Sequence, residues 1–221
     1  MSDFVNTIDL LGDDVVARQL LDGSITEFKD DVVTSVSTSH FSNCNNLTTI
    51  ELPNVVGTTN VYDNRHFAKN PKLTTLNLPK LAGFSPYMIE QNDVLEKVVF
   101  PSVKNADNGG VMNNKSLRIV DFHIAEKIGN RLLENDTALV CLILRNENIC
   151  ASISTDWLYR TPIASGTGYI YVPRALLSDE DATKDYRRAT NWSAYVPNQF
   201  RALEDYTVDG TITGEIDESK I

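Results

Sequence analysis

One unit of sequence occurs five times in this chain, and this repetition limits the fold more than any other feature. The segments LTTIELPNVVG and LTTLNLPKLAG share the skeleton L-T-T-x-x-L-P-x-x-x-G. The leading leucine stands at Leu47, Leu73, Leu95, Leu117 and Leu139, so the step is constant after a slightly longer first one. A unit this short cannot bury its own apolar side chains. Consecutive units must therefore stack into a solenoid with a continuous core.

Further positions of the unit are apolar in almost every copy. Three positions after the leading leucine stand Ile50, Leu76, Val98, Val120 and Leu142, and five positions after it stand Leu52, Leu78, Phe100, Phe122 and Leu144. Six positions before it stand Phe41, Phe67, Ile89, Val111 and Leu133, and eleven before it stand Val36, Tyr62, Phe84, Ala106 and Ile128. The short apolar alternation predicts one strand per unit and hence a parallel sheet. The prolines Pro53, Pro79 and Pro101 follow the strand and end it.

One position of the unit is polar rather than apolar. It holds Cys44, Asn70, Asn92, Asn114 and Asp136. A short polar side chain at a fixed turn can bond backbone groups of a neighbouring coil that have no sheet partner. We therefore predict a buried polar ladder along the array.

The unit resembles the leucine-rich repeat of the BspA-like kind, and FSNCNNLTTIELPNVV from Phe41 matches it nearly throughout. The resemblance covers about residues 32 to 149, and the segments 168–173 and 189–203 resemble C-terminal caps of such arrays in bacterial and bacteriophage proteins. It implies an α/β repeat solenoid, a right-handed coil of about five repeats that are each roughly 22 to 26 positions long. The expected coil has a parallel sheet on one face and helical caps at both ends.

We divide the chain into four parts on this basis. Residues 1–31 are an N-terminal extension and capping helix, 32–163 the repeat array, 164–206 the C-terminal cap, and 207–221 an acidic tail or hairpin. The N-terminal helix is predicted over residues 13–22, followed by a capping strand in SITEFKDD.

In the C-terminal cap, TGYIYVP predicts a strand, and Pro173 with the pair Ser178 and Asp181 predicts a helix that runs to Thr190. The core is expected to be closed by Trp192, Tyr195, Phe200 and Leu203. Residues 207–221 form either a small hairpin around Asp209-Gly210 or a tether to a following module.

Residues that alternate with the buried ones point out of the strand face, which is the usual binding surface of a solenoid. The candidate ligand-binding residues are Thr49, Glu51, Thr75, Asn77, Lys97, Val99, Ile119, Asp121, His123, Ile143 and Arg145, and Cys141 lies in the same row. The first two repeats present small polar groups, whereas the last three present apolar ones. Three interpretations of that apolar stripe stay open: ordinary β-branched strand residues, a partner-binding stripe, or a surface covered by the chain's own tail or cap.

The charge of the chain limits the class of partner. The net charge of −10 disfavours nucleic acid and anionic membranes. No apolar run reaches the roughly 18 residues of a membrane span, and the start lacks the basic region of a signal peptide. The localisation therefore stays open between a virion, the cytoplasm and a secreted form whose signal has been removed.

Residues able to do chemistry are scattered. The three cysteines, Cys44, Cys141 and Cys150, are expected to be small buried thiols, although the last two could pair. The three histidines lack further ligands at metal-binding spacing, and no nucleophile or phosphate-loop motif is present. We expect no enzyme, no catalytic or metal site and no cofactor.

Two functions fit this sequence. The first is a non-enzymatic binding or adhesion module that recognises a protein or cell-surface glycan through the concave strand face or loops. The C-terminal resemblance suggests for it a bacteriophage tail-associated or receptor-binding protein acting in host recognition. The alternative is a structural or assembly protein that forms homo-oligomers, or joins a virion, through its strand face or C-terminal tail.

Overall fold

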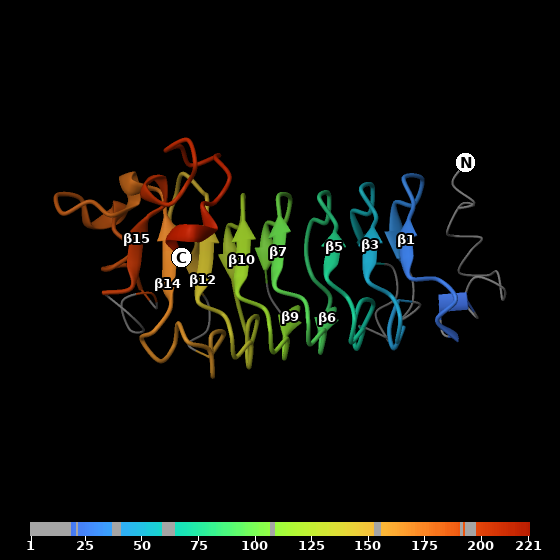
Figure 1. Cartoon of the computed structure of the whole chain (residues 1–221). Helices are drawn as coiled ribbons and strands as arrows, with labels where there is room; N and C mark the ends of the chain where they lie inside the picture. The colour runs from blue at the N-terminus through green and yellow to red at the C-terminus, as the bar shows by residue number, and fades with distance from the viewer. Residues whose placement is uncertain are drawn as a thin grey trace.

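The computed structural model describes residues 19–20, 22–36, 41–58, 65–106, 109–152, 156–190, 192 and 198–221. Over these residues the chain coils into a solenoid of parallel strands, which confirms the predicted architecture of the array (Figure 1). Successive coils lie side by side along one axis, so equivalent residues of consecutive repeats become neighbours. None of the described helices has the length and apolar character needed to cross a bilayer.

The main face carries the predicted strands. In spatial order they are β1 (Glu27–Lys29), β3 (Thr49–Glu51), β5 (Thr75–Asn77), β7 (Lys97–Phe100), β10 (Ile119–Phe122), β12 (Cys141–Leu144), β14 (Tyr169–Val172) and β15 (Phe200–Ala202). The first three form one sheet and the last five another, with β5 beside β7 (Figure 1). All pairs are parallel, and the register places Ile50 opposite Leu76 and Val98 opposite Val120, as the repeat predicts.

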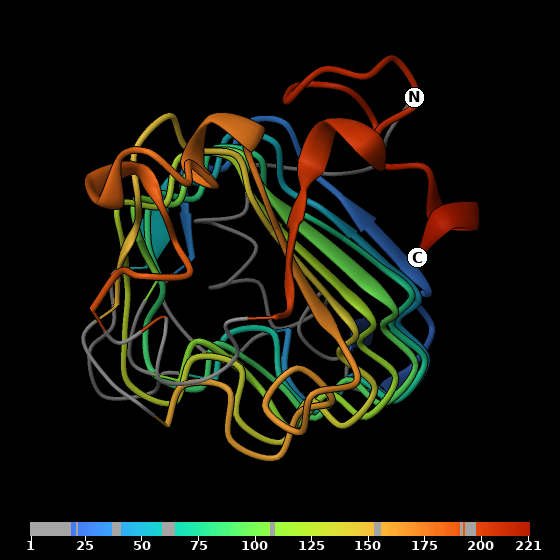
Figure 2. The same cartoon turned by 90° about the vertical axis from the view of Figure 1, so that its left-hand side faces the viewer.

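Two further faces carry two-residue strands, which the sequence did not predict. The second face pairs β2 (Ser35–Val36) with β4 (Gly57–Thr58), and joins β8 (Asn105–Ala106), β11 (Lys127–Ile128) and β13 (Ala151–Ser152). The third pairs β6 (Ile89–Glu90) with β9 (Val111–Met112). The view along the axis shows the coils superposed around a common interior (Figure 2).

In each unit, the residue directly before the polar ladder residue has a left-handed backbone conformation. The residues there are Asn43, Lys69, Gln91, Asn113 and Asn135, with φ between 56° and 60°. A positive φ is uncommon outside glycine and is best tolerated by asparagine, which occupies three of the five positions. This column turns the chain in each coil and positions the side chain that follows it.

The core consists of the predicted apolar columns. All five leading leucines are fully buried, and the described members of the other columns are buried as well, except Phe84, which is partly buried and packs against the core. Stacked phenylalanines add contacts between coils, with ring centroids 5.7 Å apart for Phe41 and Phe67 and 5.4 Å apart for Phe100 and Phe122. The remaining column residue, Tyr62, lies outside the described residues.

The polar ladder is confirmed. The backbone N–H groups of Cys44, Asn70 and Asn92 each donate to the side-chain oxygen of the next member of the column, at 3.0 Å. The Asn114 N–H donates to Asp136 Oδ1 at 2.7 Å. Each asparagine amide also donates to a backbone carbonyl of the preceding coil, Asn70 to Phe41, Asn92 to Phe67 and Asn114 to Ile89. From Asn70 onward, every ladder side chain therefore satisfies buried backbone groups of the coil before it.

The N-terminal cap contains the predicted strand. β1 pairs with β3 and places Phe28 opposite Ile50, one repeat step earlier in the chain. Phe28 is fully buried and contacts Phe41 edge-on at 4.8 Å between ring centroids. Residues 19, 20 and 22 are helical, and the rest of the helix predicted over 13–22 lies outside the described residues.

The C-terminal cap contains the predicted strand, β14, but the prediction of one helix from Pro173 to Thr190 is wrong. Two 3₁₀ helices, η1 (Arg174–Leu176) and η2 (Ala182–Lys184), stand in its place. Ser178 Oγ accepts from the Asp181 N–H at 3.1 Å, as at a helix start. The chain then folds back, because the Ser178 N–H donates to the Lys184 carbonyl and Leu177 bridges Asp185 in antiparallel fashion.

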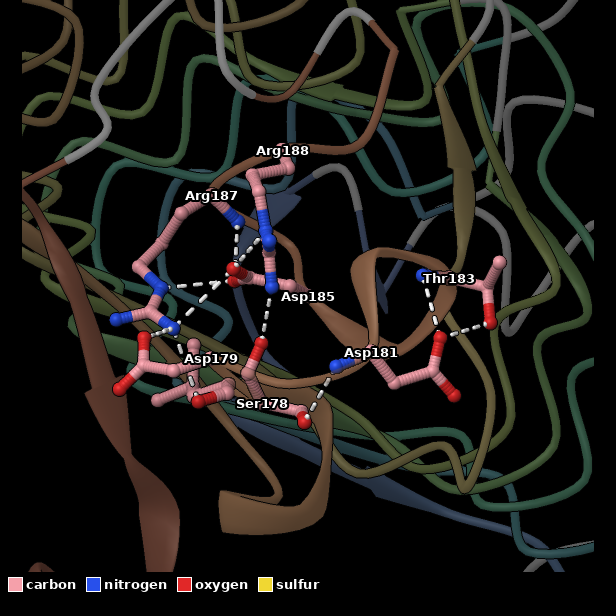
Figure 3. Close-up of polar contacts among 8 residues, drawn as sticks. Ser178, Asp179, Asp181, Thr183, Asp185, Arg187 and Arg188 are labelled. Carbon is pink, nitrogen blue, oxygen red and sulfur yellow. Dashed lines mark hydrogen bonds and ion pairs between the residues drawn. The ribbon is translucent and has the colours of Figure 1, made fainter.

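Asp185 is the centre of this fold-back (Figure 3). Its buried carboxylate accepts from the Nε groups of Arg187 and Arg188, at 2.7 Å each, and from the Arg187 N–H at 3.0 Å. Burial alone would raise the pKa of Asp185, but the hydrogen bonds from the two arginines outweigh it and lower the pKa. These bonds within the fold-back take the place of the backbone hydrogen bonds that a continuous α-helix would have formed.

Aromatic residues close the C-terminal end of the core, as predicted. Trp192 and Phe200 are buried, and Trp192 Nε1 donates to the Cys150 carbonyl at 2.7 Å. Tyr186 packs against both rings, and its hydroxyl accepts from the Cys150 N–H at 2.7 Å. Leu203 is also buried, but on the outer side of the main sheet. Tyr195 lies outside the described residues.

Candidate binding face and its C-terminal cover

The outward row of the main sheet divides into two halves. In the first half, which comprises β1, β3, β5 and β7, the outward side chains reach solvent. Thr75 and Asn77 are exposed. The other predicted residues of this half are partly exposed; they are Thr49, Glu51, Lys97 and Val99. We call this half the open face.

In the second half, four predicted ligand-binding residues are buried. They are Ile119, Asp121, Ile143 and Arg145. Residues 203–221, which we call the C-terminal cover, lie on this half of the sheet (Figure 1) and outside the solenoid (Figure 2). Of the three interpretations of the apolar stripe, the structure therefore supports the covered surface for Ile119 and Ile143, whereas Val99 stays partly exposed.

A second hydrophobic cluster holds the cover on the sheet. Its buried members are Ile119, Cys141, Ile143, Tyr171, Leu203 and Ile216, and Val140, Tyr206, Ile212 and Ile221 pack against them. This cluster lies on the outer side of the sheet, separate from the core of the solenoid. The apolar stripe that the repeats predict thus packs against apolar residues that lie much later in the chain.

The cover has an ordered, hairpin-like backbone. It begins with η3 (Leu203–Asp205) and ends with η4 (Glu218–Lys220). Thr207 bridges Ile216 in antiparallel fashion, and the Val208 N–H donates to the Glu215 carbonyl at 2.9 Å. Gly214 allows the close approach of Asp209, because a Cβ at residue 214 would fall on the Asp209 carboxylate.

Arg145 joins the sheet to the cover. Its Nε and Nη2 atoms bond both oxygens of Asp121 at 2.7–3.1 Å. Its Nη1 donates to the Ile212 carbonyl at 2.6 Å and to the Gly214 carbonyl at 2.9 Å. A fork-shaped guanidinium can satisfy a carboxylate and two carbonyls at once, which an ammonium group cannot do with the same geometry. At the other edge of the cover, Lys97 pairs with Glu218 at 2.6 Å.

The histidines do not form a metal site in the described residues. His123 Nε2 lies 3.7 Å from Asp121 Oδ1. Burial lowers the pKa of His123, the charge of Asp121 raises it, Arg145 lowers it, and the net shift is downward. His66 is buried and contacts Ser85 at 3.1 Å, whereas His40 lies outside the described residues. No cluster of three metal-ligating side chains occurs among the residues that the structure describes.

All three cysteines are free and buried. Burial raises the pKa of Cys44 to about 11 and that of Cys150 to about 12. Cys141, on the outer side of the sheet beneath the cover, also has its pKa raised by burial. The expectation of small buried thiols is confirmed, and these thiols are poor nucleophiles because the thiolate is disfavoured.

Two hollows lie beside the outward row, and the sequence predicted neither. The first is a groove of about 580 Å³ along the turns next to the polar ladder, lined by Asn45, Lys69, Pro71, Gln91, Asp93, Asn113, Lys115, Asn135 and Thr137. The second is a pocket of about 490 Å³ between the sheet and the cover, lined by Arg118, Val140, Thr167, Tyr169, Tyr171, Arg201, Tyr206, Lys220 and Ile221. We call the second the edge pocket. Its residues come from coils and cover segments too far apart in sequence to form a recognisable motif.

Comparison with protein families identifies the repeats. The model of the BspA type leucine rich repeat region matches residues 24–140 in six copies. Its first copy begins in the segment that contains β1, so the N-terminal capping strand belongs to a repeat. No curated protein and no solved structure matches the chain. Repeats of this kind generally mediate protein interactions, which supports a binding or adhesion module. The chain belongs to the BspA-type leucine-rich repeat family.

Proposed function

We propose that this protein is a non-enzymatic binding module that docks a partner protein on the open face. The observation that supports the proposal is the division of the outward row: the second half is covered by the chain itself, whereas the first half stays accessible. An accessible, regularly spaced row of side chains on a rigid solenoid is a typical interaction surface.

The chemistry of the open face favours a polar contact. Thr75 and Asn77 offer exposed hydrogen-bonding groups. Lys29 lies 3.0 Å from Glu51 and 3.6 Å from Glu27, so the charges of the first coils compensate one another. The whole chain carries a net charge of −10. A partner with a basic surface is therefore attracted at long range and then contacts polar groups.

The alternative of assembly through the apolar stripe or the tail has less support. Ile119 and Ile143 are buried under the cover, and the cover's own apolar residues Ile212 and Ile216 pack against the sheet. The apolar stripe and the apolar residues of the cover therefore bury each other within one chain. The more specific hypothesis of a bacteriophage virion component stays a prediction, since the family match does not bear on the source of the chain.

Paired charge insertions test the proposal. The face variant is Thr75→Arg/Asn77→Arg, and the control is Thr137→Arg/Asn148→Arg, which makes the same charge change at exposed residues outside the open face. Proteins captured from surface extracts by the wild type are identified, purified and titrated against all three chains. We expect a basic partner whose affinity falls at least tenfold with the face variant and stays within twofold with the control. A partner that binds the wild type and face variant equally would contradict the proposal.

A further inference from the structure

The edge pocket differs in charge from the rest of the molecule. Three cationic side chains line it, those of Arg118, Arg201 and Lys220, and its lining contains no aspartate or glutamate side chain. Lys220 is paired with Asp217 at 3.5 Å, so the two arginines supply most of the positive charge of the pocket. This concentration of positive charge occurs in a chain of net charge −10. Clustered cations in a partly enclosed hollow favour an anionic ligand.

The Arg118 side chain has no structural task within the described residues. It is exposed, and among these residues it makes no side-chain hydrogen bond or ion pair. Its backbone is fully used in the sheet, because its N–H donates to Glu96 and its carbonyl accepts from Val140 and Cys141. A guanidinium free to make two parallel bonds is well suited to a carboxylate.

Tyrosine rings form the walls of the edge pocket. Tyr171 and Tyr206 meet edge-on with centroids 4.8 Å apart, and Tyr169 lies 6.5 Å from Tyr171. The Arg201 guanidinium lies 4.1 Å above the Tyr169 ring, which keeps both side chains in place. Rigid rings with hydroxyl tips offer both apolar faces and hydrogen bonds to one ligand.

Tyr171 presents its hydroxyl to the edge pocket. The residue lines the pocket and is 1% exposed, and its hydroxyl makes no hydrogen bond within the described part of the chain. The hydroxyl oxygen is not one of the described buried polar atoms that lack a partner, so it is accessible from the pocket. It is therefore available to bond a hydroxyl group of a ligand there.

The backbone around the edge pocket argues against a peptide ligand. The Val140 N–H donates to Arg118 and the Val140 carbonyl accepts from Tyr169, so these main-chain groups are already paired. Recognition must therefore rely on side chains. A pocket of about 490 Å³ lies within the range that holds a small molecule. Its rings, hydroxyls and guanidinium groups match a sugar ring that carries a carboxylate.

We propose that the edge pocket binds a carboxylated saccharide, of the uronic or sialic acid class, at a site separate from the open face. Arg118 binds the carboxylate. The tyrosines contact the apolar face of the ring, and Thr167 with the tyrosine hydroxyls bonds its hydroxyl groups. Arg201 holds Tyr169 in position and adds positive charge.

An array of oligosaccharides with matched acidic and neutral members, followed by calorimetry, tests this proposal. The best acidic oligosaccharide is compared with its methyl ester and with acetate, which separate saccharide recognition from attraction of a simple carboxylate. We expect binding to the acid, at least tenfold weaker binding to its ester, and no saturable binding of acetate. Absence of saturable binding to every carboxylated saccharide at 1 mM protein and ligand, a scale on the order of weak single-site affinity, would overturn the proposal, as would equal binding of acid and ester.

Variants locate the site. Arg118→Ala and Tyr169→Ala are expected to lower the affinity for the acidic oligosaccharide at least tenfold. The matched control is Arg160→Ala, which removes another arginine stacked on a tyrosine, 5.1 Å above Tyr159 and outside the edge pocket. Because the Arg118 side chain is exposed, its variant should fold normally, which circular dichroism checks. Binding unchanged in Arg118→Ala would contradict the assignment, and the open-face variant Thr75→Arg/Asn77→Arg should leave saccharide binding intact.

Discussion

Arg145 and Asp121 form a buried ion pair between two neighbouring coils, in which both carboxylate oxygens bond the guanidinium at 2.7–3.1 Å. Their side chains are only 6% and 4% exposed. The same guanidinium bonds two carbonyls of the cover. The pair therefore determines how the last part of the chain attaches to the sheet.

Arg145→Ala is expected to lower the free energy of unfolding by about 3–5 kcal/mol, since it leaves Asp121 as a buried charge without its partner. Urea denaturation followed by circular dichroism measures this loss. The control is Arg174→Ala, which removes a pair with Asp205 in which both side chains are 59% exposed. Such exposed pairs contribute roughly 0–1 kcal/mol. Equal effects of the two substitutions would contradict the anchoring role of Arg145.

Thiol labelling reports the opening of the cover. In the native protein at pH 8, Cys44 and Cys150 should react with maleimide slowly, because both are buried and have raised pKa values. Cys141 is also buried, but beneath the cover rather than in the solenoid core. We expect Cys141 to be labelled first below the unfolding transition, and at least tenfold faster in Arg145→Ala. Peptide mass mapping identifies the labelled cysteine, and simultaneous labelling of all three would contradict this order.

Asp136→Asn is expected to stabilise the protein at neutral pH. Burial raises the pKa of Asp136 well above its ordinary value, with bonds from Asn114 acting in the opposite direction. A carboxyl whose folded pKa is raised binds more protons in the folded state, so its stabilising effect is complete below the unfolded pKa and is lost as pH rises through the folded pKa. Asparagine, which occupies three earlier positions of the column, carries no such charge.

Thermal unfolding of the Asp136→Asn variant and wild type between about pH 4 and pH 7 checks this sign, since the window starts near the ordinary carboxyl pKa. The midpoint of the variant should exceed that of the wild type by a few degrees at pH 7, and the gap should close toward pH 4. A gap that widens in acid would contradict the assignment.

Asn92→Ala interrupts the polar ladder at its centre. The substitution leaves the buried Asn70 N–H and Phe67 carbonyl without their bonds at 3.0 Å and 2.9 Å. The expected loss is about 2–4 kcal/mol for two unsatisfied buried groups. Asn148→Ala, at an exposed residue, is the matched control and should change stability by about 0.5 kcal/mol or less. Chemical denaturation of both variants makes the comparison, and a small effect at Asn92 would mean that water replaces the amide.

The periodic part of the fold was predictable because every coil imposes the same burial on the same position. The repeat step also extends backward from Ile50 to Phe28, a signal that identifies β1 as part of a repeat. The left-handed column was missed, although Asn43, Asn113 and Asn135 are the residue type that tolerates it best.

Structural features that do not recur with the repeat could not be predicted in the same way. The helix signals at Pro173 and Ser178 are local, but the fold-back depends on Asp185 and its bonds to Arg187 and Arg188. The covered half of the outward row depends on a cluster that joins Ile119 to Ile216, two residues far apart in the chain without any shared spacing. For that reason the candidate site contained both accessible residues such as Thr75 and buried ones such as Ile143.

The ladder bonds have a direction, since each side-chain oxygen accepts from a backbone N–H of the coil before it. In a duplicated unit inserted between Asn70 and Asn92, the ladder side chain would accept from the backbone N–H of the coil before it. The backbone N–H of the inserted unit would in turn donate to the ladder side chain of the coil after it. Gene duplication can thus lengthen this protein by whole coils on the accessible side while Arg145 and the segment that it anchors keep their neighbours. The molecule is built so that the length of its open face can change without redesign of either end.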